Sequence, residues 1–311
     1  MRVPFAAVVF SLAASVAGAQ PSSLPRTPDG HPDLQGIWAN DTVTTLERPK
    51  RFADKEILSE QEAIEYERDI VGRWRERFDD LEVTTTGELS EVWQEVGKVV
   101  PGRRTSLIVD PKDGRIPSLT SQARARADAR AEARKTHPAD GPEDRPAVER
   151  CLIGTTGPPM LPPPYNANLQ IVQTRDRVLI LNEMIHDVRI VRMNGAHLPP
   201  AMRQWLGDSI GRWDGSTLVV ETTNFTDKTR FRGAGDGLRV IERFTRASAD
   251  TIRYDFTVDD AESFSRPWSG LLWLTKTGGP IYEYACHEGN YALIDILRGA
   301  RATEAASKRE R

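Results

Sequence analysis

From residue 149 onward, the sequence is a succession of short strand-like segments separated by turns, and this spacing is the strongest constraint on the fold. The segments are rich in Val, Ile, Leu and Thr, and turn signals recur about every 8–12 residues, which is typical of an antiparallel barrel or sandwich. Alternation with one apolar face favours a barrel with a lined interior. The expected strands are 168–174, 177–181, 187–193, 217–222, 238–245, 251–258, 271–275 and 281–285.

Turn residues predict how several of these strands pair. Asn194-Gly195 is a hairpin dipeptide that follows strand 187–193 directly. Ser248-Ala249-Asp250 separates two further strands. Gly278-Gly279 lies between 271–275 and 281–285, so we expect those two segments to form a hairpin.

The chain before residue 149 has a different pattern. Residues 55–80 read as a surface helix, with Ser59 and Glu62 spaced as a capping box. A hairpin is expected over 105–116, and a solvated helix over 121–135. A cluster rich in proline at 137–146 marks the natural boundary. We therefore expect an N-terminal helical and irregular segment (20–148) packed on a barrel (149–300), followed by a disordered charged tail (301–311).

Residues 1–19 have the pattern of a cleavable signal peptide. Arg2 precedes an apolar stretch over 4–16, and Ala17-Gly18-Ala19 is a small-residue cleavage site. The stretch is too short for a membrane anchor, since a helix needs about 18 apolar residues to span a bilayer. No later stretch is apolar enough to cross a membrane, so the sequence predicts a periplasmic or secreted protein without a transmembrane segment.

The chain carries only two cysteines, Cys151 and Cys286. An even pair in an exported protein predicts a disulfide, and two buried thiols are the alternative. This bridge would close a long loop. By constraining the unfolded chain, it would stabilise the fold by about 4–5 kcal/mol.

Charge and motif content exclude several classes of function. The formal net charge is −3 for the 311 residues, whereas a nucleic-acid-binding protein usually has a strong basic bias. The sequence has no Gly-x-Ser-x-Gly, no P-loop and no Gly-x-Gly-x-x-Gly signature followed by a helix. Ordinary α/β-hydrolase, kinase and nicotinamide dehydrogenase functions therefore lose support, and no cofactor is assigned.

The segment 282–291 is the densest polar cluster. If it is a strand, Glu288 shares a face with Tyr284 and Cys286, while His287 points to the other face. A histidine beside a carboxylate at a barrel mouth is a candidate acid–base site. The alternative is a rim histidine and a solvated glutamate.

A second candidate lies at 183–187. On a strand, His186 would share the apolar face of Val188 and Ile190 and point into the barrel, with Asp187 on the other face. A lone interior histidine is more often a hydrogen-bonded core residue than a catalyst. Metal binding by His186, His287 and a carboxylate is a minority alternative, and no metal ligand is assigned.

Glu242 falls on the apolar face of its strand, beside Val240 and Phe244, and is expected to point inward. A buried carboxylate needs a partner, and Arg230 or Arg232 is the expected one. A general acid or anion clamp is the functional interpretation, and a structural ion pair is the alternative.

Aromatic and polar side chains near these motifs are candidate ligand-binding residues. Core packing is the alternative for most of the tryptophans, including Trp268 and Trp273. The candidates are Trp38, Trp213, Arg230, Arg232, Tyr284 and Asn290.

Several motifs resemble a family of uncharacterised exported proteins from soil bacteria. The most specific are Pro-Asp-Leu-Gln-Gly-Ile-Trp at 32–38 and Tyr-Glu-Tyr-Ala-Cys-His-Glu-Gly-Asn-Tyr at 282–291. The resemblance implies no catalytic assignment. More weakly, the hairpins resemble those of lipocalin-like and fatty-acid-binding-like barrels, which supports a fold and not a function.

Taken together, the sequence predicts a mostly antiparallel, lipocalin-like β-barrel with an N-terminal helical segment. The expected function is acid–base chemistry on a small molecule at the barrel mouth, as a lyase, hydratase, isomerase or hydrolase. The assigned residues are His186 or His287 as base, with Asp187, Glu288 or Glu242 as partner. A non-catalytic binding protein for an apolar or aromatic ligand is the alternative, and a structural envelope protein is a third.

Overall fold

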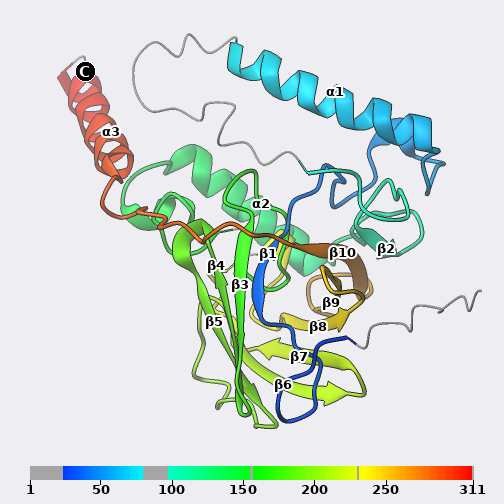
Figure 1. Ribbon diagram of the computed structural model, residues 1–311. Helices are drawn as coiled ribbons and strands as arrows, with labels where there is room; N and C mark the ends of the chain where they lie inside the picture. Colours follow the sequence, from blue (N-terminus) through cyan, green and yellow to red (C-terminus); the bar gives the residue numbers. More distant parts are fainter. Residues whose placement is uncertain (1–23, 80–96, 155–156, 230, 310–311) are drawn as a thin grey trace, which may run out of the picture.

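The computed structural model describes residues 24–79, 97–154, 157–229 and 231–309, and the expected signal peptide lies outside these ranges. Nine strands form a closed barrel (Figure 1). The strands are β1 (Gly36–Ala39), β3 (Asn168–Gln173), β4 (Arg177–Asn182), β5 (Val188–Met193), β6 (Asp208–Asp214), β7 (Thr217–Thr223), β8 (Arg239–Arg246), β9 (Thr251–Asp259) and β10 (Trp268–Lys276). Short β1 closes the barrel by pairing with both β3 and β10. The predicted mainly antiparallel barrel is confirmed.

The barrel encloses the main hydrophobic core. Along β8, buried residues alternate with half-buried ones, as expected for a strand with one face inside. Trp38, Phe244 and Trp268 are fully buried within this core. Gly270 lies opposite Phe256, and a Cβ at Gly270 would come within 2.2 Å of the Phe256 ring. The glycine therefore leaves room for the ring on the inner face of β10.

One predicted hairpin is wrong. Asn194-Gly195 does follow β5, but β5 and β6 are parallel, with Val191 opposite Ser209. The chain from 194 to 207 returns along the barrel before β6 begins, so it is a crossover rather than a tight turn. We name residues 194–207 the crossover segment. All other strand pairs are antiparallel in the part of the chain that the structure describes.

The predicted strand 281–285 is also absent. The free edge of β10 is used by β1 and by β2 (Ile108–Asp110), so no edge is left for a strand after Gly278-Gly279. Figure 1 shows the orange segment after β10 running across the end of the barrel toward α3. This path brings the 282–291 motif to the loops at that end.

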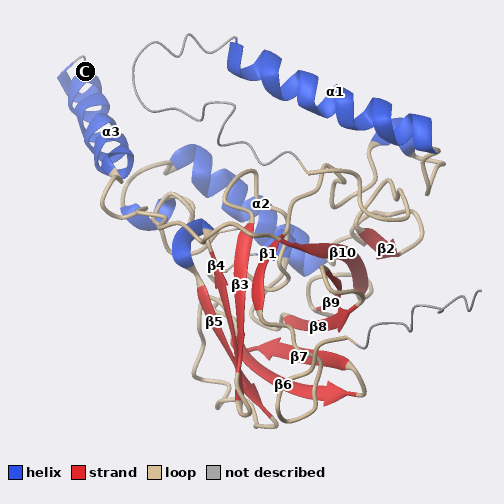
Figure 2. Cartoon of the chain, in the orientation of Figure 1, coloured by secondary structure: helices blue, strands red, loops and turns tan. Residues whose placement is uncertain are grey.

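Helices and short turns lie outside the barrel (Figure 2). The capping box of α1 is confirmed, since the Ser59 amide donates to the Glu62 carboxylate and the Glu62 amide donates to the Ser59 hydroxyl. None of the described helices is both long and apolar enough to cross a membrane. The helices are α1 (Glu60–Asp79), α2 (Ser121–Thr136) and α3 (Tyr291–Arg309), with 3-10 turns η1 (Lys50–Phe52), η3 (Pro142–Asp144), η4 (Met184–His186) and η5 (Phe231–Gly233).

Two further expectations differ from the structure. Of the hairpin expected at 105–116, only β2 is a strand, and it pairs with β10 instead of with a second arm. The tail expected to be disordered continues α3 as an exposed helix through Arg309. The composition of this tail is compatible with disorder and with a helix, because Ala, Arg, Glu and Lys are good helix formers and the charged ones are also well solvated.

A buried ion pair crosses the barrel interior. The Arg189 guanidinium on β5 donates to both carboxylate oxygens of Glu242 on β8, and the Tyr254 hydroxyl on β9 donates to the same carboxylate at 2.7 Å. The Met160 amide donates to the Tyr254 hydroxyl at 2.8 Å. Burial alone would lower the pKa of Arg189, but the Glu242 carboxylate outweighs it and the pKa is raised.

The inward direction of Glu242 is confirmed, whereas Arg232 is wrong as its expected partner. Arg189 is the partner, because β5 points Arg189 and Val191 into the barrel and leaves Val188 and Ile190 outside. Arg232 is exposed in η5, and Arg230 lies outside the described residues. Because Glu242 is fully buried and paired with Arg189, the structure favours a structural ion pair over a general acid or an anion clamp.

Replacing Glu242→Gln is expected to destabilise the fold by about 3–5 kcal/mol, because the Arg189 charge stays buried without a counter-charge. The double variant Arg189→Met/Glu242→Gln should recover much of that loss. Urea unfolding of the three proteins measures both effects. If Glu242→Gln were as stable as the parent, the ion pair would not be needed for the stability of the fold.

Candidate functional site

Three chain segments meet at the end of the barrel where β4 leads into β5. They are the loop 183–187, the stretch after β10 around Tyr284 and His287, and the loop after Cys151. The Cys151–Cys286 disulfide joins the last two, with a Cα separation of 5.8 Å, and confirms the predicted bridge. We call His186, Asp187, Tyr284 and His287 the histidine corner.

Asn290 fastens the disulfide loop further. Its side-chain amide donates to the Glu149 carbonyl at 2.8 Å and lies 3.5 Å from the Cys151 sulfur. Asn290, predicted as a ligand-binding residue, therefore holds the disulfide loop through its contacts with Glu149 and Cys151.

The loop that carries His186 has an unusual backbone. Ile185 and His186 are both in the left-handed region, with φ of 61° and 46°. A β-branched residue with positive φ is an outlier, and such positions cost about 1–3 kcal/mol and cluster at functional sites. Glu183, itself buried, accepts hydrogen bonds from the side-chain amides of Asn166 and Asn168 and anchors the start of the loop.

The expectation that His186 points into the barrel is wrong. The chain leaves the strand after Asn182, and the left-handed turn directs His186 outward, where it is exposed. Met184 and Ile185 are buried in its place. His186 is therefore accessible to a small molecule from solvent.

A main-chain contact fixes the orientation of the His186 ring. Its Nδ1 lies 3.0 Å from the Tyr284 carbonyl oxygen. A carbonyl can only accept a hydrogen bond, so Nδ1 carries the proton and Nε2 of the neutral ring keeps its lone pair. This is the arrangement of a histidine that can take a proton through Nε2.

His287 comes close to His186, so the structure brings the two predicted histidine motifs together. The ring centroids are 6.3 Å apart, and the planes are tilted by 50°. Both His287 and Glu288 are exposed in a turn. Because this stretch is not a strand, the predicted separation of their side chains onto two faces does not apply.

Asp187 is the buried carboxyl of the corner, with 8% of its surface exposed. Its Oδ2 accepts a hydrogen bond from the Gly154 amide at 3.2 Å. Burial raises the pKa of Asp187 to about 6, while the Gly154 amide and the neighbouring His186 act in the opposite direction. A carboxyl that titrates near neutral pH can act as both acid and base.

Tyr284 completes the corner. Its hydroxyl lies 3.2 Å from that of Tyr165, and the two rings stack with centroids 6.4 Å apart. Burial first, and the Tyr165 contact second, raise the pKa of Tyr284 above its usual range. Tyr284 therefore stays protonated and acts as a hydrogen-bonding group.

A cavity of about 390 Å³ reaches Gly154, but none of the four residues of the histidine corner lines it. Gly154 is part of its wall, so the amide that holds Asp187 also borders the cavity. Its size falls in the range of small-molecule sites, which is about 300–1,000 Å³. The other lining residues are Ile153, Gly157, Pro158, Leu161, Trp205, Leu206, Phe225, Thr229, Phe231 and Arg232.

The predicted tryptophan ligands are placed differently. Trp38 is fully buried, and its indole nitrogen donates to the Leu34 carbonyl at 3.0 Å, so it serves the core. Trp213 stacks on His31 with centroids 4.7 Å apart, away from the histidine corner. Of the predicted ligand-binding side chains with a described position, only Arg232 lines the 390 Å³ cavity.

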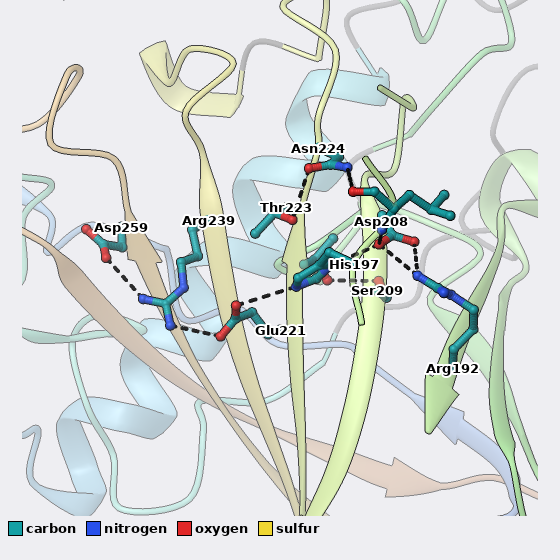
Figure 3. A network of polar contacts seen from close by, with 11 residues as sticks. Arg192, His197, Asp208, Ser209, Glu221, Thr223, Asn224, Arg239 and Asp259 are labelled. Atoms are coloured by element: carbon teal, nitrogen blue, oxygen red, sulfur yellow. Dashed lines mark hydrogen bonds and ion pairs between the residues drawn. The ribbon is translucent and has the colours of Figure 1, made fainter. Parts of the chain in front are cut away.

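Sequence reasoning missed a second polar network on the outer face of the barrel (Figure 3). His197 Nδ1 lies 2.9 Å from Asp208, and its Nε2 lies 3.4 Å from Glu221. Arg192 pairs with Asp208 at 2.7 Å and Arg239 with Glu221 at 2.8 Å. No local pattern signals this network, because the parallel crossover brings His197 to its partners.

The charges of this network are satisfied. Burial would raise the pKa of Asp208, but hydrogen bonds from the Leu198 amide, His197 and Arg192 lower it overall. Arg239 is the main cause of the lowered pKa of Glu221. We therefore assign this network a structural role and keep the histidine corner as the candidate site.

Within the described residues, no group of three or more His, Cys, Asp or Glu side chains is placed to hold a metal ion. His186 and His287 form a pair without a third ligand of this kind.

No protein-family model matches the chain. No curated protein and no solved structure matches it either. The resemblance to exported soil-bacterial proteins stays a prediction.

The buried Asp187 gives a pH-dependent stability. Its pKa of about 6 lies above the ordinary 3.8, so the folded protein holds the extra proton between these values and loses stability as pH rises from about 4 to 6. Asp187→Asn removes this loss and should be more stable than the parent at pH 8, by up to about 3 kcal/mol, and similar at pH 4.

Urea unfolding at both pH values measures this difference. The exposed Asp250→Asn is the matched control and should not change the pH dependence. An Asp187→Asn variant that shows the same loss between pH 4 and 8 as the parent would contradict the assignment.

Proposed function

We propose that the histidine corner carries out acid–base catalysis on a small organic molecule. The single observation that carries this proposal is the His186 ring, whose Nδ1 is held by the Tyr284 carbonyl while the residue stays exposed. His186 Nε2 serves as the base. Asp187, with a pKa of about 6, is the accompanying proton donor and acceptor.

The reaction classes that fit are elimination, hydration, isomerisation and hydrolysis. Each needs one group to remove a proton and another to deliver one near neutral pH. His287 supplies a second imidazole 6.3 Å from the first. The strained backbone at Ile185 and His186 also supports the proposal. Such conformations persist only where the surrounding structure holds them, and they cluster at functional sites.

A non-catalytic binding protein is the second candidate. The observation that favours it is the cavity of about 390 Å³, whose lining is mainly apolar. A binding protein would be stabilised by its ligand and release it unchanged, whereas an enzyme would convert it.

His186→Asn is the sharpest test of catalysis. Asparagine tolerates positive φ and keeps a side-chain donor for the Tyr284 carbonyl, but it has no basic nitrogen. We expect kcat/KM for any substrate found among esters, lactones and hydroxy acids to fall about 10²–10⁴-fold. Replacing both His186 and His287 should abolish turnover with the fold intact.

The matched control is His137→Asn, at an exposed histidine paired with Asp140 outside the corner. Full activity in the double histidine variant would overturn the proposal. A ligand that stabilises the protein and is recovered unchanged would select the binding function.

We further propose that the chain is exported. The Cys151–Cys286 disulfide supports this, since such bonds persist in oxidising compartments. Mass spectrometry of the protein from an exporting host should give a mature chain that begins at Gln20 and is two hydrogens lighter than its reduced form. A mass that still includes residues 1–19 would contradict the predicted cleavage.

A further inference from the structure

A second cavity, of about 270 Å³, adjoins the apolar one. Trp205 and Thr229 line both. The Thr229 hydroxyl donates to the Trp205 carbonyl at 2.8 Å, which holds this shared wall together. The two cavities therefore meet at Trp205 and Thr229, so one ligand can contact the lining of both there.

The first cavity suits an apolar body. Leu161, Leu206, Phe225 and Phe231 contribute aliphatic and aromatic surface. Trp205 adds an aromatic ring at the boundary. Burial of an apolar group against such side chains supplies most of the binding free energy of a small ligand.

The second cavity has an excess of positive charge. Its lining carries Arg134, Arg145, Arg150 and Lys228 against Glu143 and Asp144. Two of the arginines have ion-pair partners, as Arg145 pairs with Glu149 at 2.8 Å and Arg150 with Glu143 at 3.3 Å. These pairs leave Arg134 and Lys228 against the single carboxylate of Asp144, so the lining keeps an excess of positive charge.

Arg134 and Lys228 make no ion pair with a carboxylate in the described part of the chain. Arg134 comes from α2, and Lys228 comes from the loop after β7. Two cations from separate elements at the edge of one cavity attract an anionic group and orient it.

We propose that the ligand of this site is an amphiphilic organic anion, a carboxylate whose apolar body fills the cavity of Leu206 and Phe225 while its head group lies between Arg134 and Lys228. This inference goes beyond the proposed function, because no residue of the histidine corner lines either cavity, and its binding test is independent of turnover. It places the apolar body against the Gly154 wall, behind which Asp187 lies.

The probe is 1-naphthoate, with the neutral 1-naphthalenemethanol as its matched partner, and binding to the full mature protein is measured by isothermal titration calorimetry. We expect 1-naphthoate to bind more tightly than the alcohol, and the difference to shrink as salt is raised. Arg134→Gln and Lys228→Gln should each weaken 1-naphthoate about three- to fivefold, and the double variant about tenfold or more, without changing the alcohol.

Arg124→Gln is the control, since Arg124 is exposed on the same helix but does not line the cavity. Leu206→Gln should weaken both probes alike. Equal affinity for acid and alcohol, or an unchanged affinity in the double variant, would overturn the proposal. Normal 1-naphthoate binding to His186→Asn would support the ligand class even if the corner proved not to be catalytic.

Discussion

The buried contact between Arg189 and Glu242 fixes the register of the barrel, and the position of the histidine corner depends on it. A one-residue slip of β5 would turn Arg189 outward and leave the Glu242 carboxylate unpaired in the core, which costs several kcal/mol. Apolar packing alone would not prevent that slip, because Val188 and Ile190, now on the outer face, could fill the interior positions with apolar side chains. With β5 held in this register, Asp187 and the left-handed turn at His186 come directly before its first residue.

The sequence predicted features that repeat locally. Strand periodicity, turn residues and the capping box of α1 all follow from side chains a few positions apart, and Glu242 was placed inside because its neighbours Val240 and Phe244 are apolar. The same rule failed for β5, where Val188 and Ile190 face solvent and Arg189 is inside. Arg189 is stabilised there by a carboxylate 53 positions away, so no local signal shows its direction.

Closure of the barrel explains why the candidate site was only half predicted. Once β1 and β2 occupy the edge of β10, the following segment has no strand to pair with and crosses the barrel end (Figure 1). The disulfide and Asn290 then hold it beside the loop 183–187. The sequence supplied the histidines and the disulfide, but their proximity arises from strand pairings between distant segments, which a residue pattern does not encode.

The outer network of Figure 3 fastens the crossover segment to the barrel wall. His197 and Leu198 lie near the start of the crossover segment and are held by Asp208, while the Asn224 side chain donates to the Leu198 carbonyl at 2.9 Å. Trp205 and Leu206 lie near the end of the same segment and form the wall of the apolar cavity. The segment is thus fastened near its start by charge-assisted hydrogen bonds, which are stronger than neutral ones. The structural role of His197 is therefore to hold the crossover segment on the barrel, and the parallel strand pair that hid it from sequence analysis is what makes this arrangement possible.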